Sequence, residues 1–403
     1  WAQKNIKKRA GAMLATFALG VLIFIDDYFN CLTVGSVMRP VTDGHNISRA
    51  KLSYLIDATA APICMIAPIS SWAAAVSSYA EGTSYSGFQL FVRAIPYNFY
   101  SLLTIVMIIA MVLMKFDYGP MALHEKNALA GDLFTTGAFN QDTMKQEGTE
   151  QRGKVIDLVF PILVLIVCCV IGMIYTGGFF DGESFIDAFA NSDASIGLSS
   201  GSLLALIIII FYLLLRRLVG FKAAMECVPE GFNAMVPAIL ILTLATTLKG
   251  MTGLLGADVY VAGIMEGSAK GLQMFLPAII FVVACFLAFS TGTSWGTFGI
   301  LIPIVTAVFK GDSTILIIGI SACLAGAVCG DHCSPISDTT IMASAGAQCD
   351  HVNHVSTQLP YAITVAVVSF VSYLIAGFVQ NIVALPIAIV LMIATLFVIR
   401  AIT

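Results

Sequence analysis

The sequence predicts an all-α polytopic membrane protein, in which helices cross the bilayer many times. Of its 403 residues, 58% are hydrophobic and only 11% are charged, whereas a soluble domain carries about 25% charged residues. The apolar residues gather in runs near or above the roughly 20 residues that one helical crossing needs, and the mean hydropathy is +0.92. Polar residues, prolines and glycines interrupt the longest runs near their centres. We therefore expect about ten membrane segments, with broken helices and a re-entrant hairpin among them.

Ten apolar stretches are the candidate membrane segments. They are residues 10–39, 52–80, 95–115, 155–177, 199–217, 233–248, 272–309, 313–345, 357–378 and 383–400. Of the two hydrophilic loops, 116–154 contains both acidic and basic residues, whereas 178–198 contains no Lys or Arg. Because Lys and Arg favour cytoplasmic loops, we place loop 116–154 in the cytoplasm and loop 178–198 outside.

The chain also contains a weak internal repeat. Asp43–Tyr54 and Asp350–Tyr361 each run from an Asp to a Tyr, follow a polar-broken segment and open an apolar helix. Upstream, residues 24–33 match 330–339 as an apolar half-helix, an Asp-containing break and a second half-helix. The topology above gives the two copies opposite orientations, so we expect inverted repeats whose breaks meet near the bilayer midplane.

These observations divide one transmembrane domain into four parts. We expect a first repeat in 1–115, the cytoplasmic loop 116–154, connecting scaffold helices in 155–248 and a second repeat in 249–403. The second repeat has an extra polar break at 290–296 whose counterpart would precede residue 1. The first repeat is therefore expected to lack its N-terminal part. The chain starts with Trp1 rather than Met, and we expect no signal peptide in this first segment.

Composition narrows the function. A formal net charge of −4 without a large basic cluster argues against a nucleic-acid partner. Most of the ten cysteines lie in apolar runs, where cysteine behaves as a small hydrophobic residue. We expect free thiols rather than a disulfide framework.

The most informative motif is GDHCSPISDTT, residues 330–340, which directly follows an apolar helix. Pro335 removes a backbone donor and disfavours helix at the preceding residue. Broken backbone and ionisable groups occur at membrane depth only where protein or a water-filled cavity surrounds them. The carboxylates and hydroxyls of this motif are hard oxygen ligands, which suit a small cation such as Na⁺. They belong to Asp331, Ser334, Ser337, Asp338, Thr339 and Thr340. The alternative, a proline kink capped by hydroxyls, leaves the two carboxylates unexplained.

Three further features could belong to the same site. Asp26 and Asp27 repel each other, and desolvation favours the neutral form of a carboxyl group, so this pair suits a carrier that exchanges a proton for a cation. The alternative is an interfacial pair that caps the next helix. STGTSWG, residues 290–296, offers hydroxyl ligands or, alternatively, close helix packing. Asp57, inside a membrane segment, and His332 are candidate relay residues.

Together, GDHCSPISDTT (330–340), STGTSWG (290–296) and FIDDYFNCLTVGSVMRP (24–40) resemble motifs of the NhaC family of sodium/proton antiporters. The resemblance covers most of the chain and implies an inverted-repeat secondary transporter that works by alternating access. It assigns ion or substrate binding to Asp26, Asp27, Asn30, Thr291, Thr293, Ser294, Asp331, Ser334, Ser337 and Asp338. Members of this family differ in substrate, and this chain starts later than the family pattern.

Three functions follow as hypotheses. The first is Na⁺/H⁺ exchange, in which Asp338, Asp331 and one of Asp26 or Asp27 bind Na⁺ and H⁺ in turn. The second is Na⁺- or H⁺-coupled transport of an amino acid or small organic acid, with Trp295 or Tyr28 lining the pocket.

The third hypothesis, more remote, is a membrane metal hydrolase that uses His332, Cys349, His351 and His354, whose spacing resembles a zinc site. The first two readings predict no enzymatic activity, no cofactor and no metal beyond transported Na⁺. The expected partners are the lipid bilayer, a small cation and a second copy of the chain in a homodimer. The expected location is the bacterial inner membrane.

Overall fold

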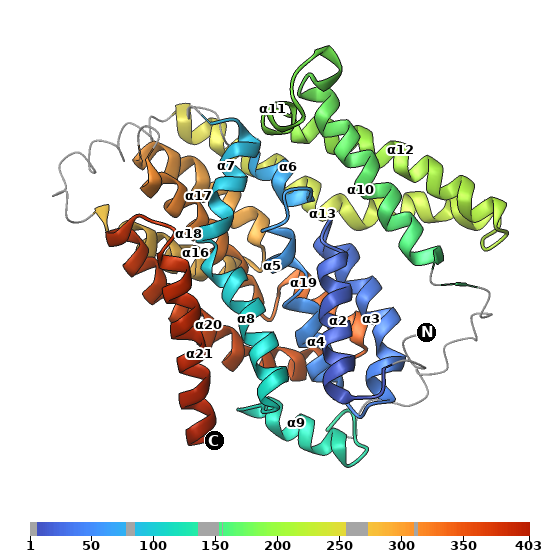
Figure 1. The fold of residues 1–403 in the computed structure, drawn as a ribbon, viewed down its shortest axis with the longest axis vertical. Coiled ribbons are helices and arrows are strands. Elements are labelled where there is room, and N and C mark those ends of the chain that lie inside the picture. The colour runs from blue at the N-terminus through green and yellow to red at the C-terminus, as the bar shows by residue number, and fades with distance from the viewer. Residues whose placement is uncertain (1–5, 78–84, 136–152, 155, 255–272, 310–312) are drawn as a thin grey trace.

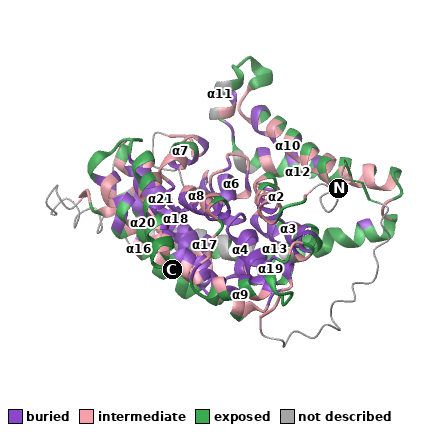
Figure 2. Cartoon of the chain, turned by 60° about the horizontal axis from the view of Figure 1, so that its bottom comes forward, coloured by how far each residue is buried: buried purple, intermediate pink, exposed green. Residues whose placement is uncertain are grey.

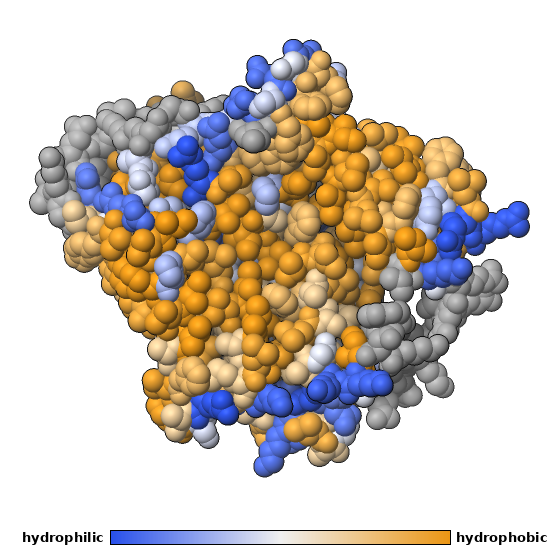
Figure 3. All heavy atoms as spheres, viewed as in Figure 1, coloured by the Kyte–Doolittle hydropathy of each residue, from blue (hydrophilic) through white to orange (hydrophobic). Residues whose placement is uncertain are grey.

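The computed structural model describes residues 6–77, 85–135, 153–154, 156–254, 273–309 and 313–403. The described part is helical throughout and contains no strand. Figure 3 shows an apolar belt across the middle of the molecule, with hydrophilic residues gathered toward its upper and lower ends. This distribution is that of an all-α integral membrane protein.

Five described helices are long and apolar enough to cross a bilayer. They are α10 (Ile156–Thr176), α12 (Ala194–Leu215, from Ile196), α18 (Thr314–Cys333), α20 (His351–Val379) and α21 (Ala384–Ile402). A bent pair raises the number to six, formed by α7 (Gly87–Ala94) with η1 (Ile95–Tyr97) and by α8 (Phe99–Met114). Several of the ten expected segments are instead arms of hairpins or pieces of broken helices.

Residues 10–39 form a helical hairpin rather than one crossing. Its arms are α2 (Arg9–Leu22) and α3 (Asp27–Asp43), and Asp26 caps α3 by accepting a hydrogen bond from the Phe29 amide (2.9 Å). The outer ends lie together, because the His45 ring nitrogen Nε2 is 3.0 Å from the Ile6 carbonyl oxygen. With 14 residues, α2 spans only about 21 Å, less than the hydrocarbon core.

A second hairpin consists of α16 (Leu276–Thr291) and α17 (Ser294–Val308). Gly292 at the turn has φ +66°, and a Cβ there would lie 2.6 Å from the Ile336 carbonyl oxygen, so the turn requires glycine. The outer end of α16 packs beside the C-terminal end of α20, where a Cβ on Gly377 would meet the backbone of Met274.

A broken helix follows each hairpin. The first passes from α4 (Arg49–Asp57) to the short α5 (Ala61–Cys64), and the second passes from α18 to α19 (Asp338–Ala347). Ser48 caps α4 and Ser337 caps α19; Pro62 follows the first break, and Pro335 lies within the second. Figure 2 shows that α4, α18 and α19 lie in the buried interior of the molecule.

The two hairpin units enter the molecule from opposite ends. The outer end of α2–α3 lies at α9 (Pro120–Leu129), where Arg9 pairs with Glu125, whereas α16–α17 lies at the other end of the long helix α20 (Figure 1). The arrangement is inverted, but in a different register from the one expected. The expected copies 43–54 and 350–361 lie at the same end, with the rings of Tyr54 and Tyr361 4.9 Å apart.

In the order of elements, the α2–α3 tip has the same place before a broken helix as the 290–296 break. The expectation that the first repeat lacks its N-terminal part stays a prediction. Hydropathy locates a break in a helix but does not tell whether the chain continues across the membrane or turns back. Asp57 of α4 thereby becomes the counterpart of Asp331 of α18.

The remaining helices surround this centre. They are α6 (Ser71–Ser77), η3 (Phe179–Asp181), α11 (Phe185–Ala190) and α13 (Phe221–Leu254). Helices α9 and α11 lie at opposite ends of the molecule (Figure 1), although the sidedness of the membrane remains a prediction. All ten cysteines are free thiols, as expected.

Candidate functional site

The two hairpin tips meet at one tryptophan side chain. The Trp72 ring of α6 lies 5.2 Å from the Trp295 ring and 5.1 Å from the Phe298 ring, centroid to centroid. Its Nε1–H also donates to Asp27 Oδ2 at 3.2 Å. The indole therefore joins the tip of α2–α3 to that of α16–α17.

Asp331 lies at the centre of this region and is fully buried. Its Oδ2 accepts hydrogen bonds from Ser294 Oγ (3.1 Å) and Thr339 Oγ1 (3.2 Å), while its Oδ1 has no hydrogen-bond partner. Ser337 Oγ lies 3.1 Å from Thr339 Oγ1 and extends the hydroxyl group network. Ser334 donates to the Phe289 carbonyl (2.8 Å) and ties the break of α18 to α16.

Two more carboxylates face the same region. The Tyr28 hydroxyl donates to Asp338, which opens α19 and accepts the Thr339 amide at 2.8 Å. Asp27 is fully buried and lies within electrostatic range of Asp338. In the described part of the chain, none of these three carboxylates forms an ion pair with Lys or Arg.

Some side chains of the expected site form hydrogen bonds with the backbone in this structure. Asn30 Nδ2 donates to the carbonyls of Gly20 (2.7 Å), Ile23 (2.9 Å) and Thr59 (2.9 Å), so it holds the hairpin closed. Thr293 caps α17. Thr291 is exposed, and its hydroxyl donates to the carbonyl of Leu287 one turn earlier.

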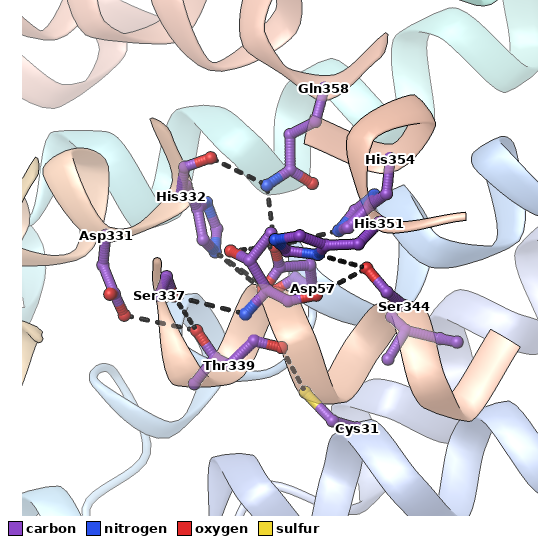
Figure 4. A network of polar contacts seen from close by, with 12 residues as sticks. Cys31, Asp57, Asp331, His332, Ser337, Thr339, Ser344, His351, His354 and Gln358 are labelled. Atoms are coloured by element: carbon purple, nitrogen blue, oxygen red, sulfur yellow. Dashed lines mark hydrogen bonds and ion pairs between the residues drawn. The ribbon is translucent and has the colours of Figure 1, made fainter. Parts of the chain in front are cut away.

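A second polar cluster surrounds Asp57, which is also fully buried (Figure 4). Its Oδ2 accepts from Gln358 Nε2 (2.7 Å) and Thr340 Oγ1 (3.0 Å) and faces His354 Nε2 at 3.3 Å. His332 Nε2 lies 3.1 Å from the Asp57 carbonyl oxygen. The two candidate relay residues are thus in contact.

Sequence reasoning missed Trp72, His354, Gln358 and Tyr100 as members of these clusters. Tyr100 Oη lies 3.1 Å from His332 Nδ1. His354 and Gln358 stand four residues apart, so they share one face of α20. Two polar side chains on one face of a mostly apolar helix were the signal that could have found them.

The first turn of α19 joins the two clusters. Its consecutive residues Asp338, Thr339 and Thr340 contact Tyr28, Asp331 and Asp57, respectively. Successive helix residues point about 100° apart, so one turn reaches three neighbouring elements. A shift of α19 would change all three contacts at once.

The residues of the metal-hydrolase hypothesis do not form a metal site. His332 and His354 face Asp57, while His351 lies 3.0 Å from Ser344 Oγ and 2.7 Å from the Pro335 carbonyl oxygen. Within the described ranges, no group of three or more His, Cys, Asp or Glu side chains could hold a metal ion.

A cavity of about 470 Å³ opens beside the α2–α3 tip. It lies between α6 and α12, and its lining includes Asp26, Ser70, Ser71, Ser199, Ser202 and Trp295. Trp295 is 5% exposed, and its Nε1–H has no hydrogen-bond partner. The lining contains one carboxylate and no Lys, Arg or His.

Re-entrant hairpins, broken helices and buried carboxylates at their junction define the class of secondary transporters. The chain belongs to the Na⁺/H⁺ antiporter family, which it matches over residues 63–378. This confirms the resemblance drawn from the motifs. The family comprises transporters rather than enzymes.

Individual relatives carry different names. The chain is 41% identical to an uncharacterised protein of Haemophilus influenzae over 94% of its own length and 73% of the relative. It is 28% identical to the malate-2H⁺/Na⁺-lactate antiporter of Bacillus subtilis, over 40% of the chain and 34% of the relative. It is 33% identical to the arginine/ornithine antiporter ArcD of Halobacterium salinarum, over 27% of the chain and 23% of the relative. The chain thus covers about a third or less of these two antiporters.

Proposed function

We propose that the chain is a Na⁺/H⁺ antiporter that works by alternating access. The observation that carries this proposal is the group of three acidic residues, Asp27, Asp331 and Asp338, gathered at the hairpin junction without a basic partner among the described residues. The chain's membership of the Na⁺/H⁺ antiporter family supports it.

The physical argument concerns charge in a buried site. An ionised carboxylate away from water must pair with a cation or take up a proton, because burying it alone is too costly. Carboxylate and hydroxyl oxygens are the ligands that hard cations prefer. We propose that Asp331, with Ser294 and Thr339, binds Na⁺ and that Asp338 and Asp27 complete the site.

The break in α18–α19 adds favourable backbone groups. It frees carbonyl oxygens at the end of α18, which can coordinate a cation, as unwound helices do in other transporters. Binding and release of Na⁺ would therefore bear directly on the position of this break.

A second candidate function is coupled transport of an amino acid or small organic acid. The cavity beside Asp26 favours it, since about 470 Å³ is within the range of small-molecule sites. One carboxylate without a basic residue suits an ammonium group better than a dianion, and Trp295 Nε1 could donate to a carboxylate or carbonyl oxygen. We also propose that the protein is a homodimer and that it resides in the bacterial inner membrane.

The test uses purified protein in liposomes that contain a pH-sensitive dye. External Na⁺, Li⁺, K⁺, arginine, ornithine and malate are added separately. We expect Na⁺ to change the internal pH and Asp331→Asn to abolish the response, while Asp181→Asn, at the exposed end of η3, keeps it. A response to an amino acid but not to Na⁺ would replace the first function with the second.

A further inference from the structure

Asp57 and Asp331 occupy corresponding places in the two inverted units. Each lies at the break of the helix that follows a hairpin, and each is fully buried. Each has one carboxylate oxygen, Oδ1, without a hydrogen-bond partner. Each also accepts a hydrogen bond from a hydroxyl in the first turn of α19. Thr340 donates to Asp57, and Thr339 donates to Asp331.

The surroundings of the two carboxylates differ in chemistry. The side chains bonded to Asp331 are hydroxyls, which coordinate cations but do not gain or lose protons near neutral pH. Asp57 faces the imidazole of His354 at 3.3 Å, and His332 Nε2 lies 3.7 Å from its Oδ1. Imidazole is the side chain that exchanges protons in the physiological range.

We propose that Asp57 and His354 form a proton-binding site separate from the Na⁺ site at Asp331. This inference rests on the proposed antiport and divides its two ions between the two repeats. If neutral His354 carries its proton on Nε2, toward Asp57, its Nδ1 is a buried acceptor, and this atom has no hydrogen-bond partner. A proton can bind to this Nδ1 or to Asp57 Oδ1 and be released from the same atom.

The titratable groups around Asp57 and His354 are acids, tyrosine, cysteine and a second histidine. From α18 come Asp331 and His332, from α19 Asp338, from α8 Tyr100 and from α3 Cys31. Helix α20 itself adds the neutral Gln358. In the described ranges, no Lys or Arg forms an ion pair with Asp57, and α9 approaches α4 only at its other end, through Ser48 and Glu125.

The two sites would be coupled by charge and by α19. The charge of Asp57 acts on Asp331, so a Na⁺ ion at Asp331 and a proton at Asp57 and His354 oppose each other in the low-dielectric interior. Thr339 and Thr340 are neighbours in sequence, so any movement of α19 alters both sites together. Occupation by one ion therefore favours release of the other.

The test compares three activities of the full chain in liposomes: Na⁺/Na⁺ exchange measured with radioactive sodium, Na⁺ uptake driven by a pH gradient, and proton release when Na⁺ is added. His354→Gln keeps an N–H donor toward Asp57 but cannot be protonated. We expect it to lower pH-driven uptake and proton release at least about 10-fold, within the range of coupling between linked sites. Na⁺/Na⁺ exchange should keep its wild-type rate.

His351→Gln is the matched control, because His351 is on the same helix but bonds to Ser344 and Pro335; it should behave as wild type. Full coupling in His354→Gln, or equal loss of exchange and coupling in a folded variant, would overturn the separate proton site. If His354→Gln does not fold, the isosteric Asp57→Asn provides the same test. Absence of Na⁺ exchange in the wild type would instead refute the proposed function.

Discussion

At the scale of single residues, buried polar side chains of the same chemical type have different roles: some could bind an ion, and others form hydrogen bonds to the backbone. Asn30 resembles a ligand in the sequence, yet its amide group satisfies three backbone carbonyls at the α2–α3 tip. Unpaired carbonyls in an apolar interior would each cost on the order of 1–3 kcal/mol. Closing the hairpin therefore accounts for the Nδ2 of Asn30, while its buried Oδ1 has no hydrogen-bond partner, and a role of this oxygen in ion binding stays a prediction.

Glu125 shows how burial acts on a carboxylate outside the membrane-spanning helices. It lies on α9, is 4% exposed, and accepts the Ser48 amide (2.9 Å) and a hydrogen bond from Arg9. Burial raises its pKa above the ordinary value of 4.5, and the charges of Lys51 and Arg9 only partly oppose this effect.

We predict a pH-dependent contribution of Glu125 to stability. A raised pKa in the folded state means that this contribution is fully present below pH 4.5 and is lost as the pH rises through the folded-state value. Glu125→Gln should therefore reduce the fall in thermal stability between weakly acidic and neutral pH. Unfolding midpoints in detergent measure this, with Glu183→Gln in an exposed loop as the control. An unchanged pH profile in Glu125→Gln would contradict it.

At the scale of elements, hairpins and broken helices depend on close helix contacts. Helices α16 and α18 cross where Gly326 and Gly330 face the backbone of α16; a Cβ on these glycines would lie 2.4 Å from the Phe281 oxygen and 2.1 Å from the Cys285 oxygen, respectively. Small residues at such crossings let helix backbones approach. This contact holds the second hairpin beside the break at Asp331.

We predict that Gly330→Ala destabilises the protein and weakens Na⁺ binding together. The added methyl group must push α16 away, at a cost of roughly 1–3 kcal/mol, and this moves Ser294 relative to Asp331. Thermal unfolding with and without Na⁺ measures both effects. Gly220→Ala, where a Cβ meets nothing within 4 Å, should change neither; equal stability of the two variants would contradict the packing argument.

The sequence was sufficient for the element types and for the positions of the breaks. Pro335, the hydroxyl-rich 290–296 segment and Asp26–Asp27 all mark real interruptions. The sequence did not predict whether the chain continues across the membrane or turns back after each break. A half-helix has the same composition in both cases. The Asp57 cluster was missed for a related reason, since its members come from α4, α18, α19 and α20 and meet only in the folded chain.

At the scale of the whole molecule, we predict that the two hairpins open toward opposite faces of the membrane. Single cysteines in place of Lys8 and His45 should be labelled from the same side as one at Lys126, because the α2–α3 arms begin and end beside α9. A cysteine at Gln380, beyond the far end of α20, should be labelled from the other side. Labelling of positions 8 and 45 from opposite sides would contradict the hairpin.

An inverted relation between the α2–α5 and α16–α19 units also predicts a second state of the protein. The same local structure can be adopted by either unit, because each consists of a hairpin followed by a broken helix. If each unit takes the conformation that its partner has here, the result is a molecule turned upside down with respect to the membrane. The site would then be open to the compartment on the other side of the membrane. Both states would use the same two local conformations, so no new fold would be needed.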